Sequence, residues 1–261
     1  MPSNEPVSTL HKNRVPLVFV HGSFANGNSW RKIISHLKDG NICLTLDLPG
    51  HGPMDDPIDF SNPTFGPEFE AIKKAISNVC DINNGIHLIG HSYGGVVALA
   101  AALKGEFKIE KMTLFEPVAA SVLSTFEYVE ELNSIASFTE KYQISYDNGE
   151  KIVCARVIDF WGGPGSFEMI PTHIQNAMAE MTKNNLRHWD LCMNEIFKIS
   201  DYNSLDIPIT LVLGSNSNSI AKLICKTLNK NLPNSSLQTI DNASHFMITT
   251  HVEECVKILK A

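Results

Sequence analysis

The sequence predicts an α/β fold built on a mainly parallel sheet of about six strands flanked by helices. Two observations lead to this prediction. Short apolar runs bounded by turn residues alternate with longer stretches of helical periodicity, as in consecutive βαβ units. The chain is also long enough, at 261 residues of which 43% are hydrophobic, to bury one large core. We therefore expect a single catalytic unit that can carry an insertion.

Six apolar runs of four or five residues are the expected strands. They cover residues 16–20, 42–46, 86–89, 112–115, 209–213 and 236–240. Helical spacing of apolar residues between and after these runs predicts five helices. They lie near residues 29–38, 66–80, 94–104, 217–230 and 251–260.

The interval from Val118 to Leu205 interrupts this alternation, because its apolar residues recur at helical spacing and no convincing strand appears. Helices are expected near residues 124–142, 150–161, 171–183 and 186–199, with a break at Gly162-Gly163-Pro164-Gly165. An insertion after one strand would overhang the carboxyl ends of the sheet, where open α/β sheets bind ligands. We therefore divide the chain into a core, residues 1–117 and 206–261, and a helical cap, residues 118–205.

Charge and composition restrict the partners. A formal net charge of −7 and a pI near 5.8 argue against nucleic acid or an anionic membrane, since both require a basic patch, and favour a small-molecule substrate. The first fourteen residues are polar and unlike a signal peptide, and the apolar run 96–103 is too short to span a bilayer. We expect a cytoplasmic protein, either monomer or homodimer.

The six cysteines are scattered without C-x-x-C spacing, so a zinc site or a disulfide framework is not expected. We predict that they are buried thiols. No glycine-rich phosphate loop or cluster of metal ligands appears either, so we predict a reaction without metal or cofactor, with water as the second substrate.

Residues 90–94, Gly-His-Ser-Tyr-Gly, fit the G-x-S-x-G pattern. An expected strand ends just before them and an apolar helix starts just after, which is the context that makes the motif informative. A sharp strand-to-helix turn exposes the hydroxyl of Ser92 and requires small residues at positions 90 and 94. The alternative is a glycine-rich turn that only starts a helix.

Three further segments resemble the α/β-hydrolase superfamily, in the family's order. They are His21-Gly22-Ser23 after the first strand, residues 47–52 (Asp-Leu-Pro-Gly-His-Gly) after the second, and residues 243–246 (Ala-Ser-His-Phe) after the last. The resemblance spans nearly the whole chain except the insertion. The family usually has two more strands at the N-terminus, and only about fifteen residues precede the first expected strand. We expect that edge hairpin to be missing or rudimentary.

The resemblance implies that Ser92 is a nucleophile and that His245 is its general base, because a serine hydroxyl needs a neighbouring base to be activated. His251, inside the last expected helix, is the alternative base. His87 and His91 beside the motif are interpreted as structural.

The resemblance also places two backbone N–H donors of an oxyanion hole at Ser23 and Tyr93. Phe24 would replace Ser23 if the loop were shifted by one residue. His21 is expected to hold this loop by a hydrogen bond.

The acid of the triad departs from the commonest family pattern, which puts an aspartate in the loop after the strand that follows the cap. Here that loop, residues 213–219, contains no carboxylate. Glu116 instead occupies the position used in haloalkane dehalogenases, at the end of the strand after the nucleophile helix, from which it could reach the δ nitrogen of His245. The alternatives are Asp241, or no working acid, with Glu116 only ending a strand.

Seven large apolar residues of the insertion could line a pocket, although helices that pack on a sheet need an apolar stripe in any case. We assign substrate contacts to Trp161 and Phe167, beside the possible lid hinge at 162–165, and to Phe24. Only two arginines, Arg156 and Arg187, lie in the insertion, so a strongly anionic substrate is not indicated.

Together these features predict a serine hydrolase that uses a Ser-His-Glu triad and an acyl-enzyme on a small apolar carboxylic ester. Enzymes with similar motifs cleave carbon–carbon bonds or act as cofactor-free haloperoxidases, and both stay open. A dehalogenase is disfavoured because its nucleophile would be an aspartate at position 92. Outside the hydrolases, a small-molecule receptor or a cofactor-free dioxygenase of the same fold is the competing hypothesis.

Overall fold

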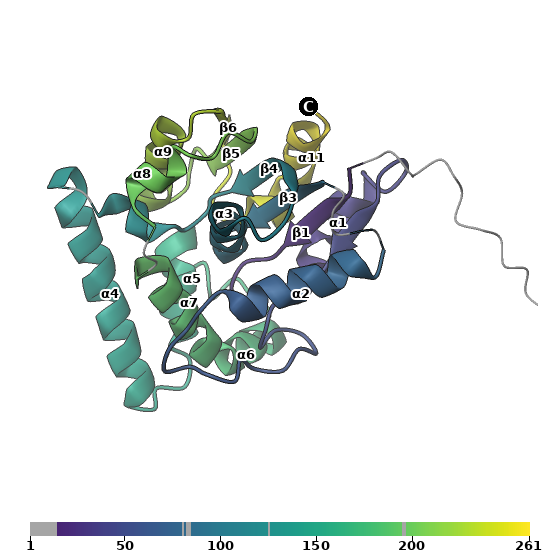
Figure 1. The fold of residues 1–261 in the computed structure, drawn as a ribbon. Helices are drawn as coiled ribbons and strands as arrows, with labels where there is room; N and C mark the ends of the chain where they lie inside the picture. The colour runs from purple at the N-terminus through teal and green to yellow at the C-terminus, as the bar shows by residue number, and fades with distance from the viewer. Residues whose placement is uncertain (1–14, 80, 82–84, 125, 195–196) are drawn as a thin grey trace, which may run out of the picture.

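The computed structural model describes residues 15–79, 81, 85–124, 126–194 and 197–261 (Figure 1). Six strands form one sheet in the order β2-β1-β3-β4-β5-β6, and every neighbouring pair is parallel. The strands are β1 (Leu17–Val20), β2 (Cys43–Thr45), β3 (Ile86–His91), β4 (Ile109–Phe115), β5 (Ile209–Gly214) and β6 (Ser235–Ile240). The predicted α/β fold with a six-stranded parallel sheet is therefore confirmed.

Strand β4 begins three residues earlier than the apolar run indicated. Ile109 pairs with Ile86 on β3, and the polar residues Glu110 and Lys111 continue the strand where it is partly exposed. Their polarity hid this end of the strand from a search for apolar runs.

Side chains alternate between the two faces of the sheet, as strand geometry requires. Val18 and Val20 of β1 belong to one apolar cluster, whereas Leu17 and Phe19 belong to the other. The first cluster packs under α2 (Gly66–Ser77), α3 (Tyr93–Lys104) and α9 (Ser219–Asn231). The second packs under η2 (Gly27–Trp30), α1 (Arg31–Ser35), α10 (Met247–Thr250) and α11 (Val252–Lys260). The sheet is thus covered by helices on both faces.

Between β4 and β5 the described residues contain helices and no strand. They are η3 (Ala120–Leu123), η4 (Phe126–Tyr128), α4 (Val129–Asp147), α5 (Cys154–Gly162), α6 (Thr172–Glu180), α7 (Thr182–Asn194) and α8 (Ile199–Tyr202). Figure 1 shows α4 to α7 gathered beside the sheet, with α4 outermost. The division of the chain into a core and a cap stays a prediction.

Two helices of this segment are displaced from their expected positions. The expected helix at 124–142 is observed as α4, which starts later because residues 126–128 form a separate 3-10 turn, η4, directly before it. The expected helix at 186–199 starts earlier, at Thr182, because the chain interrupts the preceding helix at Met181.

The cysteine prediction holds for most of the described residues. Cys154, Cys192, Cys225 and Cys255 are free and buried, whereas Cys43, on the edge strand β2, is free but only half-buried. Cys80 and the expected place of an N-terminal edge hairpin lie outside the described residues. No helix in the described part of the chain is long and apolar enough to cross a membrane.

Candidate active site

Ser92 lies at the turn between β3 and α3, with φ 55° and ψ −122°. This conformation is rare for a residue with a side chain, so the turn is strained. A Cβ atom at position 90 would come within 2.5 Å of the Gly94 carbonyl oxygen, and one at position 94 would collide with the Val20 backbone. The two glycines are therefore needed because the turn brings backbone segments together, as the motif predicted.

His245 follows the end of β6 and contacts the carboxylate of Glu116 at the end of β4. Its Nδ1 lies 2.7 Å from Glu116 Oε2, and both side chains are buried. The other carboxylate oxygen, Oε1, accepts hydrogen bonds from the N–H of Gly214, at 2.8 Å, and from the hydroxyl of Ser217. The loop that lacks a carboxylate thus supplies donors to a carboxylate on the neighbouring strand.

Burial alone would raise the pKa of the Glu116 carboxyl. Its hydrogen bonds with His245, Ser217 and Gly214, together with the charge of His245, outweigh burial and hold this pKa below its ordinary value. Glu116 is therefore ionised at neutral pH and can only accept hydrogen bonds. Neutral His245 must then carry its proton on Nδ1, which leaves Nε2 free to accept one.

His91, the residue before Ser92, supports the backbone of His245. Its Nε2 lies 2.8 Å from the His245 carbonyl oxygen, and because a carbonyl only accepts, Nε2 carries the proton. Burial, and next the nearby charge of His245, lower the pKa of His91 to about 3. The predicted structural role of His91 agrees with this contact, and His87 likewise bonds to Thr113, at 2.8 Å.

The loop after β1 is held by His21, as expected. His21 Nε2 accepts the N–H of Leu48 at 2.9 Å, and its Nδ1 donates to the carbonyl of Gly22 at 2.7 Å. The next residue, Ser23, shares a 2.7 Å hydrogen bond between its hydroxyl and Nδ1 of His188. Phe24, with φ 58°, ends the loop in a left-handed conformation. The loop is thus fixed from two sides.

Tyr93 begins α3, so its N–H has no acceptor within the helix. Its ring stacks on His188 of α7, with centroids 3.6 Å apart, and its hydroxyl donates to Glu68 Oε1 at 2.8 Å. Burial, followed by the Glu68 charge, raises the pKa of the Tyr93 hydroxyl well above its ordinary value. Both residues expected to provide oxyanion donors, Ser23 and Tyr93, therefore contact the same side chain, His188.

Glu68 on α2 and Arg187 on α7 form a second buried charged pair. Arg187 Nη1 and Nη2 donate to the two carboxylate oxygens, the second at 2.9 Å, and Nη2 also donates to the Thr64 carbonyl oxygen at 2.6 Å. Both side chains are buried. The pair ties α7 to α2 next to the start of α3.

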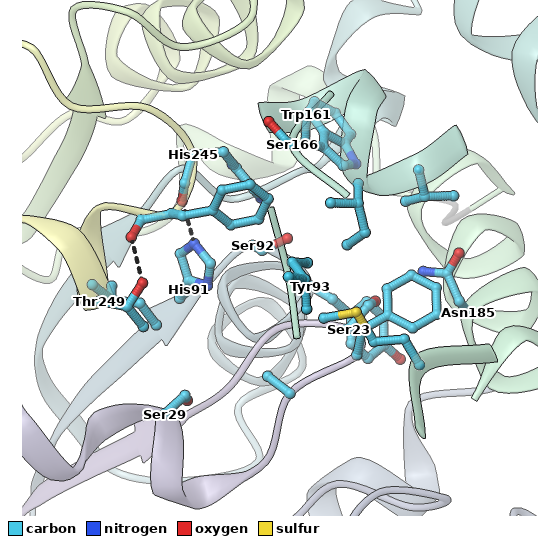
Figure 2. A pocket seen from close by; sticks show the side chains of 18 of the residues that line it. Ser23, Ser29, His91, Ser92, Tyr93, Trp161, Ser166, Asn185, His245 and Thr249 are labelled. Carbon is cyan, nitrogen blue, oxygen red and sulfur yellow. Dashed lines mark hydrogen bonds between the residues drawn. The ribbon is translucent and has the colours of Figure 1, made fainter. Parts of the chain in front are cut away.

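Ser92, His245, Ser23 and Tyr93 line one cavity of about 640 Å³ (Figure 2). Its walls are mostly apolar, and no Asp, Glu, Lys or Arg is found among the described residues that line it. The apolar residues that line it come mainly from the segment between β4 and β5. Those of this segment are Val118, Val157, Ile158, Trp161, Met169, Ile170, Pro171, Ile174, Met178, Trp189 and Cys192.

Two of the three residues predicted to contact the substrate line the cavity. Phe24 and Trp161 line the cavity, and the Trp161 ring stacks on His245 with centroids 5.4 Å apart. The substrate contact of Phe167 stays a prediction: Phe167 is buried in the larger apolar cluster and is not among the residues that line the cavity. The Asp159 carboxylate accepts the N–H of Phe167 and fixes the turn so that Ser166 reaches the cavity instead.

The alternative site residues lie elsewhere. His251 caps the start of α11, bonds to the Thr250 hydroxyl and is not among the residues that line the cavity. Asp241 is exposed. Asn185 and His188, which sequence reasoning missed, face the cavity from α7. The available signal was weak: the two polar residues stand at i and i+3, and therefore share one helix face.

A parallel sheet covered by helices on both faces, with a serine at a strained strand-to-helix turn, defines the α/β class of hydrolases. The model of the alpha/beta hydrolase family matches residues 17–258. The chain belongs to this family.

The proteins to which the chain is similar include hydrolases and an esterase. The chain is 24% identical to the uncharacterized hydrolase YugF of Bacillus subtilis, over 94% of this chain and 90% of that protein. Among solved structures, MenH from S. aureus superposes with a TM-score of 0.70 and 17% identity, covering 96% of this chain and 94% of MenH. The esterase EaEST from Exiguobacterium antarcticum gives 0.71 and 17%, covering 95% and 91%. At these identities the structural likeness shows the fold alone.

Proposed function

We propose that this hydrolase cleaves small apolar carboxylic esters through an acyl-enzyme, with Ser92 as nucleophile, His245 as general base and Glu116 as acid. The observation that carries the proposal is the 2.7 Å contact of Glu116 with His245, the histidine that lines the same cavity as Ser92. A buried carboxylate stabilises the imidazolium that forms when a histidine accepts the serine proton.

In the first half of the reaction, the Ser92 hydroxyl attacks the ester carbonyl carbon and His245 Nε2 takes its proton. The N–H groups of Ser23 and Tyr93 stabilise the negative charge on the carbonyl oxygen. His245 then returns the proton to the departing alcohol, and the acyl group stays on Ser92. Water, deprotonated by His245, attacks this acyl-enzyme and releases the carboxylic acid.

The cavity supports an uncharged substrate. A charged group placed there would lose its hydration without gaining an opposite charge from the described residues that line the wall. A mostly apolar cavity of about 640 Å³ also matches the size of sites for small organic ligands. An apolar carboxylic ester meets both conditions.

The test combines labelling with turnover. The wild-type protein should react with a fluorophosphonate probe at Ser92, identified by peptide mass spectrometry, and hydrolyse short-chain p-nitrophenyl esters. Ser92→Ala should lose both, whereas Ser29→Ala, which removes another hydroxyl from the same cavity, should be labelled like the wild type. A folded wild-type protein that is neither labelled nor active would contradict the acyl-enzyme and favour a receptor or a cofactor-free dioxygenase.

A further inference from the structure

Asn185 presents an unusual polar group in the wall of the cavity. Its side chain is buried, at 3% exposure, and its carboxamide oxygen has no hydrogen-bond partner in the described part of the chain. Figure 2 shows Asn185 on the opposite side of Ser92 from Thr249, with its amide nitrogen turned toward the cavity. A buried polar atom without a partner costs about 1–3 kcal/mol. The oxygen and the nitrogen of an amide exchange places when the amide turns by 180°, so a ligand group in the cavity can complete the oxygen once the amide has turned.

The surroundings of Asn185 place it close to the reacting end of the cavity. It precedes His188 by three residues on α7, so the two side chains lie on one helix face. His188 in turn contacts both Ser23 and Tyr93. A substrate whose carbonyl oxygen lies between these two N–H groups can therefore reach Asn185 by extending along the α7 wall of the same cavity.

The residues that line the cavity restrict which ligand group can bond to the Asn185 amide. It must be uncharged, because no Asp, Glu, Lys or Arg is found among the described residues of the wall. It must also suit a primary amide, which offers a carbonyl oxygen as acceptor and an NH₂ group as donor. A hydroxyl group both donates and accepts, so it satisfies the amide whichever way the amide is turned.

We propose that Asn185 is a specificity-determining contact for neutral esters that carry a hydroxyl group on their acyl chain. This inference rests on the proposed esterase function. It adds that plain alkyl esters are poorer substrates than their hydroxylated counterparts, since a plain chain leaves the buried amide unpaired. Sites built to bind a hydroxyl discriminate strongly against analogues that lack it.

The experiment compares p-nitrophenyl hexanoate with p-nitrophenyl esters of hexanoic acids hydroxylated at carbons 2 to 6, each rate divided by the rate of hydroxide-catalysed hydrolysis. For the wild type, kcat/KM should be about tenfold higher for at least one hydroxylated ester, the effect of one hydrogen bond of about 1.4 kcal/mol. Asn185→Leu, which keeps the number and branching of the side-chain heavy atoms but removes the amide, should lose this preference.

The matched control is Asn184→Leu. It removes the neighbouring amide of α7, which donates to Asp56 and does not line the cavity, so the ratio between the two kinds of ester should stay as in the wild type. Equal wild-type rates on all esters, or a preference that survives in Asn185→Leu, would overturn the inference and leave water as the partner of the amide.

A binding measurement separates this inference from the esterase proposal. Ser92→Ala cannot form the acyl-enzyme, and its affinity for the methyl esters of the same acids can be measured by calorimetry. Tighter binding of a hydroxylated methyl ester, lost in Ser92→Ala/Asn185→Leu, supports the contact even if no ester is turned over. Equal affinities refute it even if the wild type is an efficient esterase.

Discussion

Two buried carboxylates contact residues of the candidate site, Glu116 through His245 and Glu68 through Tyr93, and they differ in their ionic partners. Glu116 and Glu68 are both fully buried, and each accepts hydrogen bonds from several donors. Glu116 faces an imidazole, His245, whereas Glu68 faces a guanidinium, Arg187. An imidazole gains and loses a proton near neutral pH, but a guanidinium stays charged.

The ability of each pair to change its charge decides what the pair can do. The Glu116–His245 pair can carry a charge that appears and disappears during a reaction, because an imidazole has a neutral and a protonated form. The Glu68–Arg187 pair has a constant charge and joins α7 to α2, so it can fix the position of Tyr93 and His188 but not move a proton. Similar carboxylates are therefore suited to different tasks: Glu116 suits the proton transfer proposed above, and Glu68 joins α7 to α2.

The largest effect is expected when the Glu116–His245 pair loses its negative charge. Glu116→Gln keeps the shape of the side chain but removes the negative charge that holds the His245 proton on Nδ1. We expect kcat for ester hydrolysis to fall about 10⁴-fold, as when a triad acid is replaced by its amide. The measurement is steady-state hydrolysis of p-nitrophenyl esters, with circular dichroism to confirm folding. Activity within tenfold of the wild type would show that Glu116 only ends a strand.

The second effect concerns stability. Glu68→Gln leaves the Arg187 charge buried without a counter-charge, so we expect the free energy of unfolding in urea to fall by about 3–5 kcal/mol. Glu68→Gln/Arg187→Met removes both charges, keeps an acceptor for the Tyr93 hydroxyl, and should recover most of that loss. If the double variant were as unstable as the single one, packing around the pair, and not the unpaired charge, would be the cause.

The third prediction concerns how the stability of the fold depends on pH. Burial lowers the pKa values of His91 and His21 to about 3 from 6.5, so between these values the unfolded chain binds more protons than the folded one. The free energy of unfolding should therefore decrease as pH falls from about 6.5 toward 3, by up to about 1.4 kcal/mol per pH unit for each histidine. The free energy of unfolding should decrease further as pH falls toward the lowered pKa of Glu116, because protonation of this carboxylate removes its stabilising hydrogen bonds.

Urea unfolding at pH 7, 6 and 5 measures this slope. His91→Gln keeps a donor for the His245 carbonyl and removes one titrating group, so its slope should be smaller than that of the wild type. An unchanged slope in this variant would mean that His91 is protonated in the folded protein.

The smallest expected effect concerns His188, which contacts both Ser23 and Tyr93. His188→Phe preserves a ring that stacks on Tyr93 but removes the hydrogen bond to Ser23. If α7 positions the oxyanion loop, kcat should fall about three- to tenfold with KM nearly unchanged, the effect of one neutral hydrogen bond. Ser23→Ala should give a similar loss, and the double variant should lose little more. Additive losses would show that the two side chains act separately.

Much of the fold was predictable because its signals are local. Apolar runs marked the six strands, and glycines on both sides of Ser92 marked the strained turn. Glu116 could be placed near His245 because the carboxyl ends of parallel strands meet at one edge, and the observed contact agrees.

The Glu68–Arg187 pair could not be predicted in the same way. Its members are separated by 119 residues, and each looks like a solvated residue on a helix. The place of Phe167 could not be predicted either: its N–H donates to Asp159 and its side chain is buried in the larger apolar cluster, whereas Ser166 lines the cavity. Such choices depend on packing in three dimensions, and no pattern along the chain records them.

The contact between Glu116 and His245 spans 129 residues and joins the ends of two strands separated in the sheet by β5. It cannot form until β5 and β6 have both joined the sheet, after the whole helical segment has been passed. Local opening of β6 and α11 would separate the two groups while leaving Ser92 in its turn. Activity should therefore report the docking of the C-terminal part of the fold, and should disappear before the rest of the structure does on partial unfolding.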